Sequence, residues 1–273
     1  MRLLIDADLI AYEAASAADM VDEGFERRSL EWTFAKADEI VESICEACDV
    51  DKPKLYLTGK GNFRFDIATV KPYKGKRNPE KPFYLPSVRK YLETMWGAVV
   101  VDYMEADDAL AIVAARYDYK DVIIASRDKD LNQVPCLRYS WEVGNQPEWG
   151  PELVTEIGDI DVTLVDKLLK NGEPSKAIKK ISGTGLTWFY TQCITGDSTD
   201  NIPGLEGKGA GLAYELLKGL ESEMDLFNAT LGAYRVKYGD DAEERLLEQG
   251  RLLWMCREKI DGKAVMWEFP DGF

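Results

Sequence analysis

The chain has 273 residues, of which 45% are hydrophobic and 30% charged, and its formal net charge is −15. It is long enough to bury a sizeable core, either as one large domain or as a main domain with a smaller one. Histidine is absent, which excludes Ser-His-Asp and Cys-His catalysis, an imidazole base and histidine-bound transition metals. The five cysteines include one CxxC pair, Cys45 and Cys48, with no second pair near it, so we expect neither disulfides nor zinc.

Short apolar strands alternate with helices in the first half of the chain. The first strand is predicted at residues 2–6 (RLLID) and the first clear helix at residues 31–48. Further strands are predicted at Lys54–Thr58, Ala98–Asp102 and Val122–Ser126, with helices over Ser87–Trp96 and Ala109–Tyr117. This alternation favours an α/β domain with a largely parallel sheet over residues 1–145. The first strand is too short, and too soon interrupted by aspartates, for a signal peptide, so we expect a cytoplasmic location.

A basic, proline-rich segment separates the second strand from the next helix. Residues 71–86 (KPYKGKRNPEKPFYLP) predict an exposed, mobile loop or arch, which we place at about residues 71–95. A turn-rich linker follows Trp141, and the glycine clusters beyond it separate helical stretches. We therefore expect residues 150–273 to form a helical second part.

Acidic residues follow three of the predicted strands. They are Asp6 and Asp8 after the first, Glu105, Asp107 and Asp108 after the third, and Asp128 and Asp130 after the fourth. Each alone has an ordinary explanation, as a helix N-terminal acid, a turn former or a surface residue. Because open parallel sheets place their functional groups beyond the strands' carboxyl ends, the three groups should converge on one rim. Such a self-repelling cluster needs a hard cation with oxygen ligands, Mg²⁺ or Mn²⁺.

Four motifs carry a resemblance to a known family. They are IDADLIAY at Ile5–Tyr12; Phe63 and Arg64 followed by YKGKR at Tyr73–Arg77; EADDALA at Glu105–Ala111 with SRDKDL at Ser126–Leu131; and TGDSTDNIPGLEGKGAGLA at Thr195–Ala213. In these motifs the chain resembles the 5′-nuclease family of flap endonucleases and 5′ to 3′ exonucleases, and looks most like the phage-encoded exonucleases. The resemblance implies a PIN-like 5′-nuclease fold, with a DNA-backbone-binding helix-turn-helix element at about residues 195–218.

The resemblance also implies two Mg²⁺ or Mn²⁺ ions and assigns their ligands. Asp6, Glu105, Asp107 and Asp108 would serve mainly one ion, and Asp128, Asp130, Asp197 and Asp200 mainly the other. The family commonly carries a further acid just after the second strand, where this chain has Thr58, Gly59 and Lys60. This departure leaves the ligand set open beside the second strand, and Asp8 has no firm counterpart in the family.

The same resemblance suggests contacts with DNA. Lys74 and Arg77 would contact the scissile phosphate, and Tyr73 would stack on a base near the 5′ end. Further DNA contacts are implied for Arg64, Lys71, Lys76, Gly207, Lys208, Gly209 and Gly211. The helix that starts near Gly209 would offer backbone N–H groups to a phosphate, with K⁺ held by backbone oxygens as an option.

The net charge of −15 would ordinarily argue against a nucleic-acid partner. Bound cations and acidic outer helices, at residues 221–225 and 240–248, would account for much of the acidity, while basic residues gather at 71–81 and 176–180. We therefore expect a monomeric 5′ to 3′ DNA exonuclease and flap endonuclease, acting on 5′ ends, flaps, duplexes and RNA primer–DNA hybrids. It would serve phage replication, primer removal or recombination in the host cytoplasm and have no membrane partner. A PIN-like RNase and a catalytically silent DNA-junction binding module are the alternatives.

Overall fold

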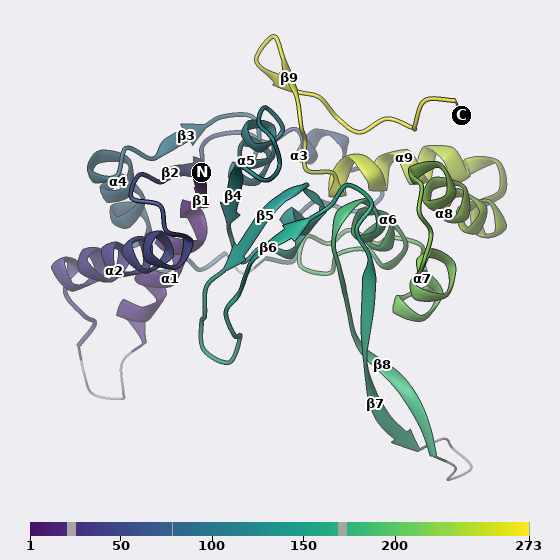
Figure 1. Ribbon diagram of the computed structural model, residues 1–273, viewed down its shortest axis with the longest axis horizontal. Coiled ribbons are helices and arrows are strands. Elements are labelled where there is room, and N and C mark those ends of the chain that lie inside the picture. Colours follow the sequence, from purple (N-terminus) through teal and green to yellow (C-terminus); the bar gives the residue numbers. More distant parts are fainter. Residues whose placement is uncertain (21–25, 78, 169–173, 273) are drawn as a thin grey trace.

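The computed structural model describes residues 1–20, 26–77, 79–168 and 174–272. Its centre is a six-stranded sheet in the order β3-β2-β1-β4-β5-β6, in which β1 to β5 are parallel and β6 is antiparallel to β5 (Figure 1). The strands are β1 (Arg2–Asp6), β2 (Lys54–Thr58), β3 (Val99–Val101), β4 (Val122–Ala125), β5 (Cys136–Ser140) and β6 (Trp149–Val154). The predicted α/β class with a largely parallel sheet is confirmed.

Helices cover both faces of this sheet, because successive strand residues point to opposite sides. Leu3 and Ile5 pack into a core with residues of three helices, whereas Leu4, between them, packs into a second core with a fourth helix. The three are α1 (Ala7–Asp19), α2 (Leu30–Cys48) and α4 (Leu85–Met95), and the fourth is α5 (Ala106–Ala114). The loops at the carboxyl ends of the strands are left to form a site.

A helical part follows, as predicted, and packs around its own core. Its helices are α6 (Gly185–Thr195), α7 (Ala210–Leu217), α8 (Glu223–Tyr238) and α9 (Ala242–Leu253). Tyr73 of the basic segment is buried in this same core, and Ile67 of the short helix α3 (Arg64–Ile67) packs against it. The two parts of the chain therefore meet at the segment that precedes α4.

The expectation of a helical part beginning at residue 150 needs correction. Strand β6 extends the sheet beyond residue 145, and β7 (Ile160–Leu168) and β8 (Pro174–Gly183) pair as an antiparallel hairpin that projects from the body (Figure 1). Among the described strands these two pair only with each other, and no third strand covers either edge of the pair. Leu164 and Val165, adjacent in β7, are both exposed.

The remaining elements are small. They are the 3₁₀ turns η1 (Lys129–Gln133) and η2 (Gly239–Asp241) and the two-residue strands β9 (Lys259–Ile260) and β10 (Lys263–Ala264). Within the described ranges, no helix is both long enough and apolar enough to span a bilayer.

Candidate active site

An acidic cleft of about 530 Å³ opens at the carboxyl ends of the central strands. Seven carboxylates from separate segments line it: Asp6, Asp8, Glu105, Asp107, Asp128, Asp130 and Asp200. The first six follow the strands β1, β3 and β4, and Asp200 comes from the loop between α6 and α7. The cleft thus brings together six of the eight acids that the sequence suggested as metal ligands, and Asp8 as well.

Local hydrogen bonds fix the backbone at the strand ends. Asp6 Oδ2 accepts from the Ser126 hydroxyl at 2.9 Å, and Asp128 Oδ1 accepts from the Asp130 N–H at 2.9 Å. Beneath them the buried Arg138 of β5 donates to the carbonyl oxygens of Ile124 and Asp128, at 2.8 and 3.1 Å. Sequence reasoning did not single out Arg138, because only the pairing of β5 with β4 places it under the acids.

The acids in the middle of the cleft carry raised pKa values. Burial, together with the charge of Asp128, raises the pKa of Asp6 to about 6 and that of Asp130 to about 8. Burial and the charges of Asp6 and Asp128 raise the pKa of Asp107 well above its usual value. Asp107 Oδ1 is also buried without a hydrogen-bond partner in the structure. These groups repel one another and are short of positive charge.

Glu105 is the exception, because basic residues neutralise it. Burial raises the pKa of this carboxyl, but Arg64 and Lys74 outweigh burial and hold the pKa at about 2. Lys74 forms an ion pair with Glu105, and the Tyr73 hydroxyl donates to Glu105 Oε2 at 2.7 Å. Lys74 therefore lies in the cleft, as the motif resemblance implied.

The start of the basic segment is docked against the α6–α7 loop, although the sequence indicated a mobile loop. The backbone N–H of Lys74 donates to the Asp200 carbonyl at 2.8 Å, and Asn201 Nδ2 donates to the Pro72 carbonyl at 2.9 Å. Arg77 forms an ion pair of 2.6 Å with the Asp200 carboxylate. The described residues between Lys71 and α4 have no helix or strand, while α4 itself forms the second half of the predicted arch.

Tyr73 does not occupy the position expected of a base-stacking residue. Its side chain is 5% exposed, and its hydroxyl lies within hydrogen-bonding distance of the Glu105 and Asp200 carboxylates, at 2.7 and 2.9 Å. Burial and the charge of Glu105 raise the pKa of this phenol. The stacking role predicted for Tyr73 is therefore corrected, because neither face of a buried ring is available to a base.

Arg64 and Asp108 form a fully buried ion pair behind the cleft. Two nitrogens of Arg64 donate to the Asp108 carboxylate at 2.6 and 2.9 Å, and the guanidinium also donates to the Leu252 and Trp254 carbonyls. Both side chains have no exposed surface. The structure thus contradicts the expectation that Arg64 contacts DNA and gives Asp108 a cationic partner in place of a metal.

Asp197 likewise lies outside the residues that line the cleft, with Lys129 beside it at 2.6 Å. Burial raises the pKa of Asp197, but the hydrogen bond and charge of Lys129 outweigh burial and lower it. Asp197 Oδ1 also accepts from the Thr199 N–H at 2.7 Å, so the carboxylate organises the turn that carries Asp200. Lys129 lies in the SRDKDL motif, but its pairing with Asp197 spans 68 residues and has no local sequence signal.

Asp8 occupies the region where the family's usual acid after the second strand is missing. Its Oδ2 accepts from the Thr58 N–H at 2.9 Å at the end of β2, and its Oδ1 pairs with Arg89 of α4. A Cβ at Gly59 would lie 2.8 Å from the Val101 carbonyl oxygen, so an acid at this position would require the backbone to shift. Sequence reasoning missed Arg89, which lines the cleft because α4 packs against α1 and the guanidinium donates to the Thr58 carbonyl at the end of β2.

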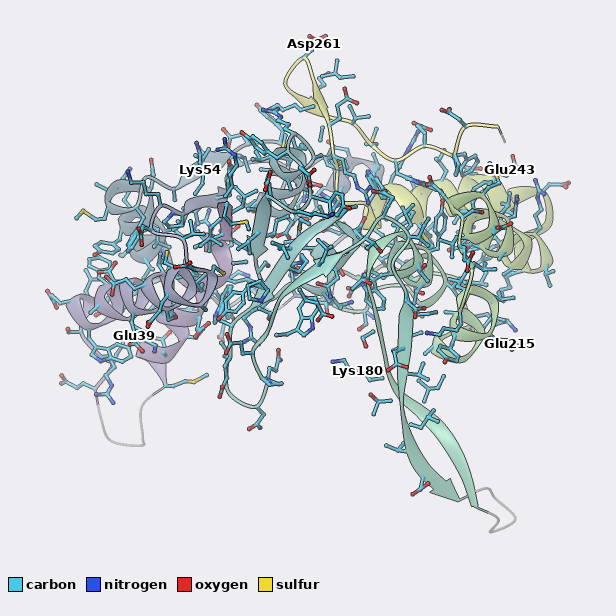
Figure 2. The ribbon with its side chains drawn as sticks, viewed as in Figure 1. Glu39, Lys54, Lys180, Glu215, Glu243 and Asp261 are labelled. Carbon is cyan, nitrogen blue, oxygen red and sulfur yellow. The ribbon has the colours of Figure 1, made fainter. Side chains whose placement is uncertain are left out.

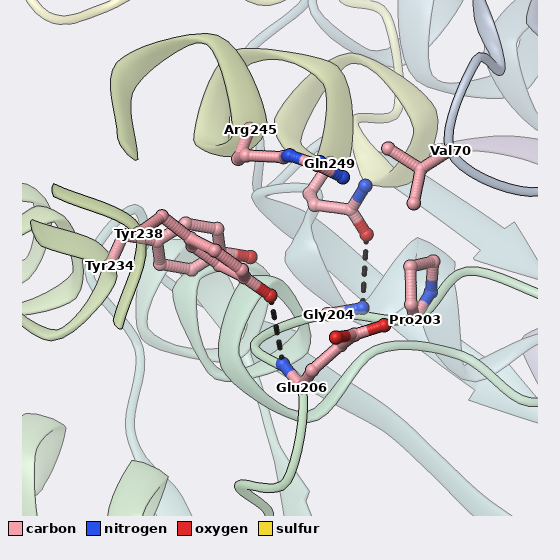
Figure 3. A pocket seen from close by; sticks show the side chains of 8 residues that line it. All are labelled: Val70, Pro203, Gly204, Glu206, Tyr234, Tyr238, Arg245 and Gln249. Carbon is pink, nitrogen blue, oxygen red and sulfur yellow. Dashed lines mark hydrogen bonds between the residues drawn. The ribbon is translucent and has the colours of Figure 1, made fainter. Parts of the chain in front are cut away.

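The glycine-rich loop between α6 and α7 is held from behind by α8 and α9 (Figure 3). The Gly204 N–H donates to Gln249 Oε1 at 2.9 Å, and the Glu206 N–H donates to the Tyr238 hydroxyl at 3.2 Å. Lys71, Lys76, Gly207 and Lys208 are exposed, and Gly209 caps α7. These predicted DNA contacts lie at the surface, and their role remains a prediction.

The donor set suits a hard divalent cation. As the side chains stand, no three acidic or cysteine residues of the described ranges are arranged to hold an ion. Glu105, Asp200 and Asp8 each pair with a basic residue. The unpartnered oxygen of Asp107 and the raised pKa values of Asp6, Asp107 and Asp130 show an excess of buried negative charge. Oxygen-rich, self-repelling sites of this kind fit Mg²⁺ or Mn²⁺.

No family model matches the chain. DNA polymerase I of Geobacillus stearothermophilus is 27% identical over 224 residues, which are 79% of this chain and 23% of that protein. This chain thus spans about a quarter of the length of the curated relatives that it matches.

Solved structures were also found, among them the following two. A bacteriophage T5 flap endonuclease in a complex with DNA and metal ions is 14% identical, covers 92% of this chain and 98% of its own, and gives a TM-score of 0.48. The catalytic core of Rad2 in complex with a DNA substrate is 12% identical, covers 99% of this chain and 84% of its own, and gives 0.46. A flap endonuclease, the kind of protein that the motifs indicated, is thus among the structures found.

Proposed function

We propose that the chain is a metal-dependent 5′ to 3′ DNA exonuclease that also cuts flaps, hydrolysing phosphodiester bonds with two divalent ions. The observation that carries this proposal is the cleft in which six predicted metal ligands meet Lys74 and Arg77. The sequence likeness to DNA polymerase I supports DNA as the substrate. We further propose that it acts as a monomer in the cytoplasm of a phage-infected cell, in replication, primer removal or recombination.

The motif resemblance supports a division of these ligands into two groups. Asp6, Glu105 and Asp107 would serve one ion, and Asp128, Asp130 and Asp200 the other. In a two-metal hydrolysis the bound ions activate water and stabilise the leaving oxygen, so no imidazole is required. Asp108 and Asp197, paired with Arg64 and Lys129, would position this set from behind.

Lys74 and Arg77 would hold the scissile phosphate. Both line the cleft, and both side chains are partly exposed, at 17% and 42%. Their flexible side chains can turn from a carboxylate to the phosphate of a bound strand, where a positive charge offsets the charge that develops during cleavage.

The loop between α6 and α7 would hold the duplex backbone, with K⁺ as an optional ion there. A Cβ at Gly209 or Gly211 would meet nothing within 4 Å, whereas the positive φ of Gly207, 76°, itself favours glycine. The protein's own packing therefore does not exclude a side chain at Gly209 or Gly211, but close approach of a phosphate to the N-terminus of α7 would. Contacts of this kind position DNA without reading its sequence.

A cleavage assay tests the proposal and its alternatives. Purified protein is incubated with 5′-labelled duplex, flap and RNA substrates, in Mg²⁺ or in EDTA, and the assay is repeated with Asp130→Ala. We expect shortening of DNA from the 5′ end and release of flaps, both lost in EDTA and in the variant. Cleavage that survives EDTA would overturn the two-metal mechanism. A preference for single-stranded RNA would favour the RNase, and DNA binding without cleavage the junction-binding module.

A further inference from the structure

The hairpin of β7 and β8 is a long element that the proposed cleavage site does not use. Its strands are 9 and 10 residues long, and none of its described residues lines the cleft. It projects from the body of the protein (Figure 1), and its exposed residues include Asp161, Thr163 and Lys180. The hairpin therefore presents a surface of its own, separate from the cleft.

The root of the hairpin is fixed to helix α7. The ammonium group of Lys218, at the C-terminal end of α7, forms an ion pair of 2.6 Å with Asp159 and donates to the Ile160 carbonyl at 2.7 Å. The Ile160 side chain is 1% exposed and packs in the same core as Leu217 of α7. After β8, the Thr184 N–H donates to the Asp159 carbonyl at 2.9 Å. The hairpin is thus held in a set orientation relative to the helix whose N-terminus would meet a phosphate.

The hairpin is basic in a strongly acidic chain. Residues 160–183 contain five lysines and three acidic residues, a net charge of +2, which leaves −17 for the rest of the chain. Three of the lysines fall within β8, at positions 176, 179 and 180, and Figure 2 shows Lys180 on the hairpin. Lysines clustered on one element are an electrostatic footprint of phosphate binding.

The partner that fits an extended basic arm rooted on α7 is the backbone of double-stranded DNA. We propose that the hairpin lies along the duplex beyond the part held by the glycine-rich loop and lengthens the stretch of DNA that the protein grips, an inference that rests on the proposed nuclease function. The ten residues of β8 extend over about 33 Å. A duplex rises about 3.4 Å per base pair, so the arm spans about ten base pairs.

The dependence of affinity on duplex length tests this arm. In a shortened variant an Asn-Gly turn joins Val162 to Ile181, which lie opposite each other in the hairpin, so that residues 163–180 are removed and the root is kept. Both proteins are titrated with flap substrates whose duplex is lengthened in steps of one helical turn, with Ca²⁺ replacing Mg²⁺ to prevent cleavage.

The two proteins should bind the shortest duplex equally. On duplexes longer by one or two turns, the wild type should bind about tenfold more tightly than the shortened variant at low salt, because the arm adds phosphate contacts. Equal affinities of the two proteins at every length would overturn the arm. They would favour a protein strand as the partner, paired with one of the two hairpin edges that no described strand covers.

Lysine substitutions test the charge without removing the hairpin. Replacing Lys176, Lys179 and Lys180 with serine should reduce the magnitude of the slope of log K against log [KCl] by about 2–3 on a long duplex and leave it unchanged on the shortest one. The matched control removes three exposed lysines elsewhere: Lys52→Ser, Lys54→Ser and Lys237→Ser. An equal change of slope in both variants, or a change that does not depend on duplex length, would contradict the arm.

Failure of the arm is distinguishable from failure of the nuclease function. If the wild type binds and cleaves DNA but its affinity does not depend on the hairpin, only the arm is refuted; if it neither binds nor cleaves DNA, the proposed function is refuted as well. All these variants keep the residues that line the cleft and should cut a flap on the shortest duplex at the wild-type rate in Mg²⁺. If the shortened variant loses this cleavage, the lysine variants, which keep the hairpin, decide the question.

Discussion

At the scale of single residues, Asp107 is the carboxylate least satisfied by its surroundings. One oxygen has no hydrogen-bond partner, and burial with two neighbouring aspartates raises its pKa. A carboxyl with a raised folded-state pKa takes up protons on folding, so it lowers stability as the pH rises above its unfolded-state pKa. At neutral pH and without divalent ions, this group therefore opposes folding.

Asp107→Asn should consequently separate stability from activity. Without divalent ions, urea denaturation at pH 7 should show a free energy of unfolding equal to or above that of the wild type. Cleavage in Mg²⁺ should fall at least about hundredfold, as for loss of a group that supports a metal site. A variant that is unstable, or one that cleaves DNA at the wild-type rate, would contradict the assignment.

Arg64 is expected to matter for stability, although its motif implied a contact with DNA. Arg64→Ala leaves the Asp108 carboxylate buried without its cation, which should cost about 3–5 kcal/mol of unfolding free energy at neutral pH. Urea denaturation measures this loss. Lys71→Ala, at an exposed position of the basic segment, is the matched control and should change DNA affinity but not stability. Equal stability of the two variants would refute the buried-pair role.

At the scale of elements, helix α9 contacts both the chain just before the basic segment and the glycine-rich loop. Glu248 accepts from the N–H groups of Thr69 and Val70, at 3.0 and 2.9 Å, just before the basic segment. The next residue, Gln249, accepts from Gly204 in the glycine-rich loop (Figure 3). One turn of one helix therefore sets the separation of the two segments that would contact DNA.

Glu248→Ala should loosen the basic segment without unfolding the protein. Hydrogen exchange at the Thr69 and Val70 amides should accelerate, and the cleavage rate should fall about 10- to 100-fold through misplacement of Lys74. Glu248→Gln keeps an acceptor oxygen and should restore much of the activity. Glu244→Ala, exposed one turn earlier on the same helix, should behave as the wild type. Unchanged amide exchange in Glu248→Ala would rule out the tether.

The elements also show which parts of the structure could be read from sequence. Strands β1 and β4 are apolar runs that end at acids, so both they and their place at the site were predictable. Strand β5 was missed because it contains Arg138, whose burial depends on carbonyl oxygens at the end of β4. The hairpin of β7 and β8 was missed because it is held by cross-strand pairing, which joins residues that are apart in the sequence.

The residues of the predicted site divide in the same way, into those that local sequence reveals and those that depend on contacts between distant parts of the chain. Strand-end logic and the motifs found the acids of the cleft, because these depend on chain order and sheet topology. They could not reveal that Arg64 is buried, since its partners Leu252 and Trp254 are 188 and 190 residues away. The burial of Tyr73 had no local signal either, because it depends on the core of α6 to α9.

At the scale of the whole molecule, the net charge of −15 is spread unevenly. Exposed acids such as Glu215 and Glu243 lie on the outer helices α7 and α9 (Figure 2), whereas Lys71, Lys76 and Lys208 are exposed on the segments proposed to meet DNA. DNA association should therefore be local and sensitive to salt, despite the acidic total.

Lys208→Ala tests this local electrostatic contact. Duplex affinity measured over a range of KCl concentrations should fall at low salt, and the slope of log K against log [KCl] should decrease by about 1, as for one lost phosphate contact. The exposed Lys237 of α8 provides the control, because Lys237→Ala makes a matched charge change away from the loop. An equal change of slope in both variants would indicate a general charge effect and contradict the assigned contact.

The docking of residues 72–77 on the loop that carries Asp200 has an energetic consequence. Because the two segments contact each other, DNA bound at one changes the affinity of the other for DNA. The factor by which the affinity changes must be the same in both directions. A duplex that orders the glycine-rich loop would favour the docked basic segment, and a phosphate held by Lys74 would tighten the grip on the duplex by the same factor. The protein would then sense whether a 5′ end and its adjoining duplex are present together, through Lys74, Asp200 and Asn201.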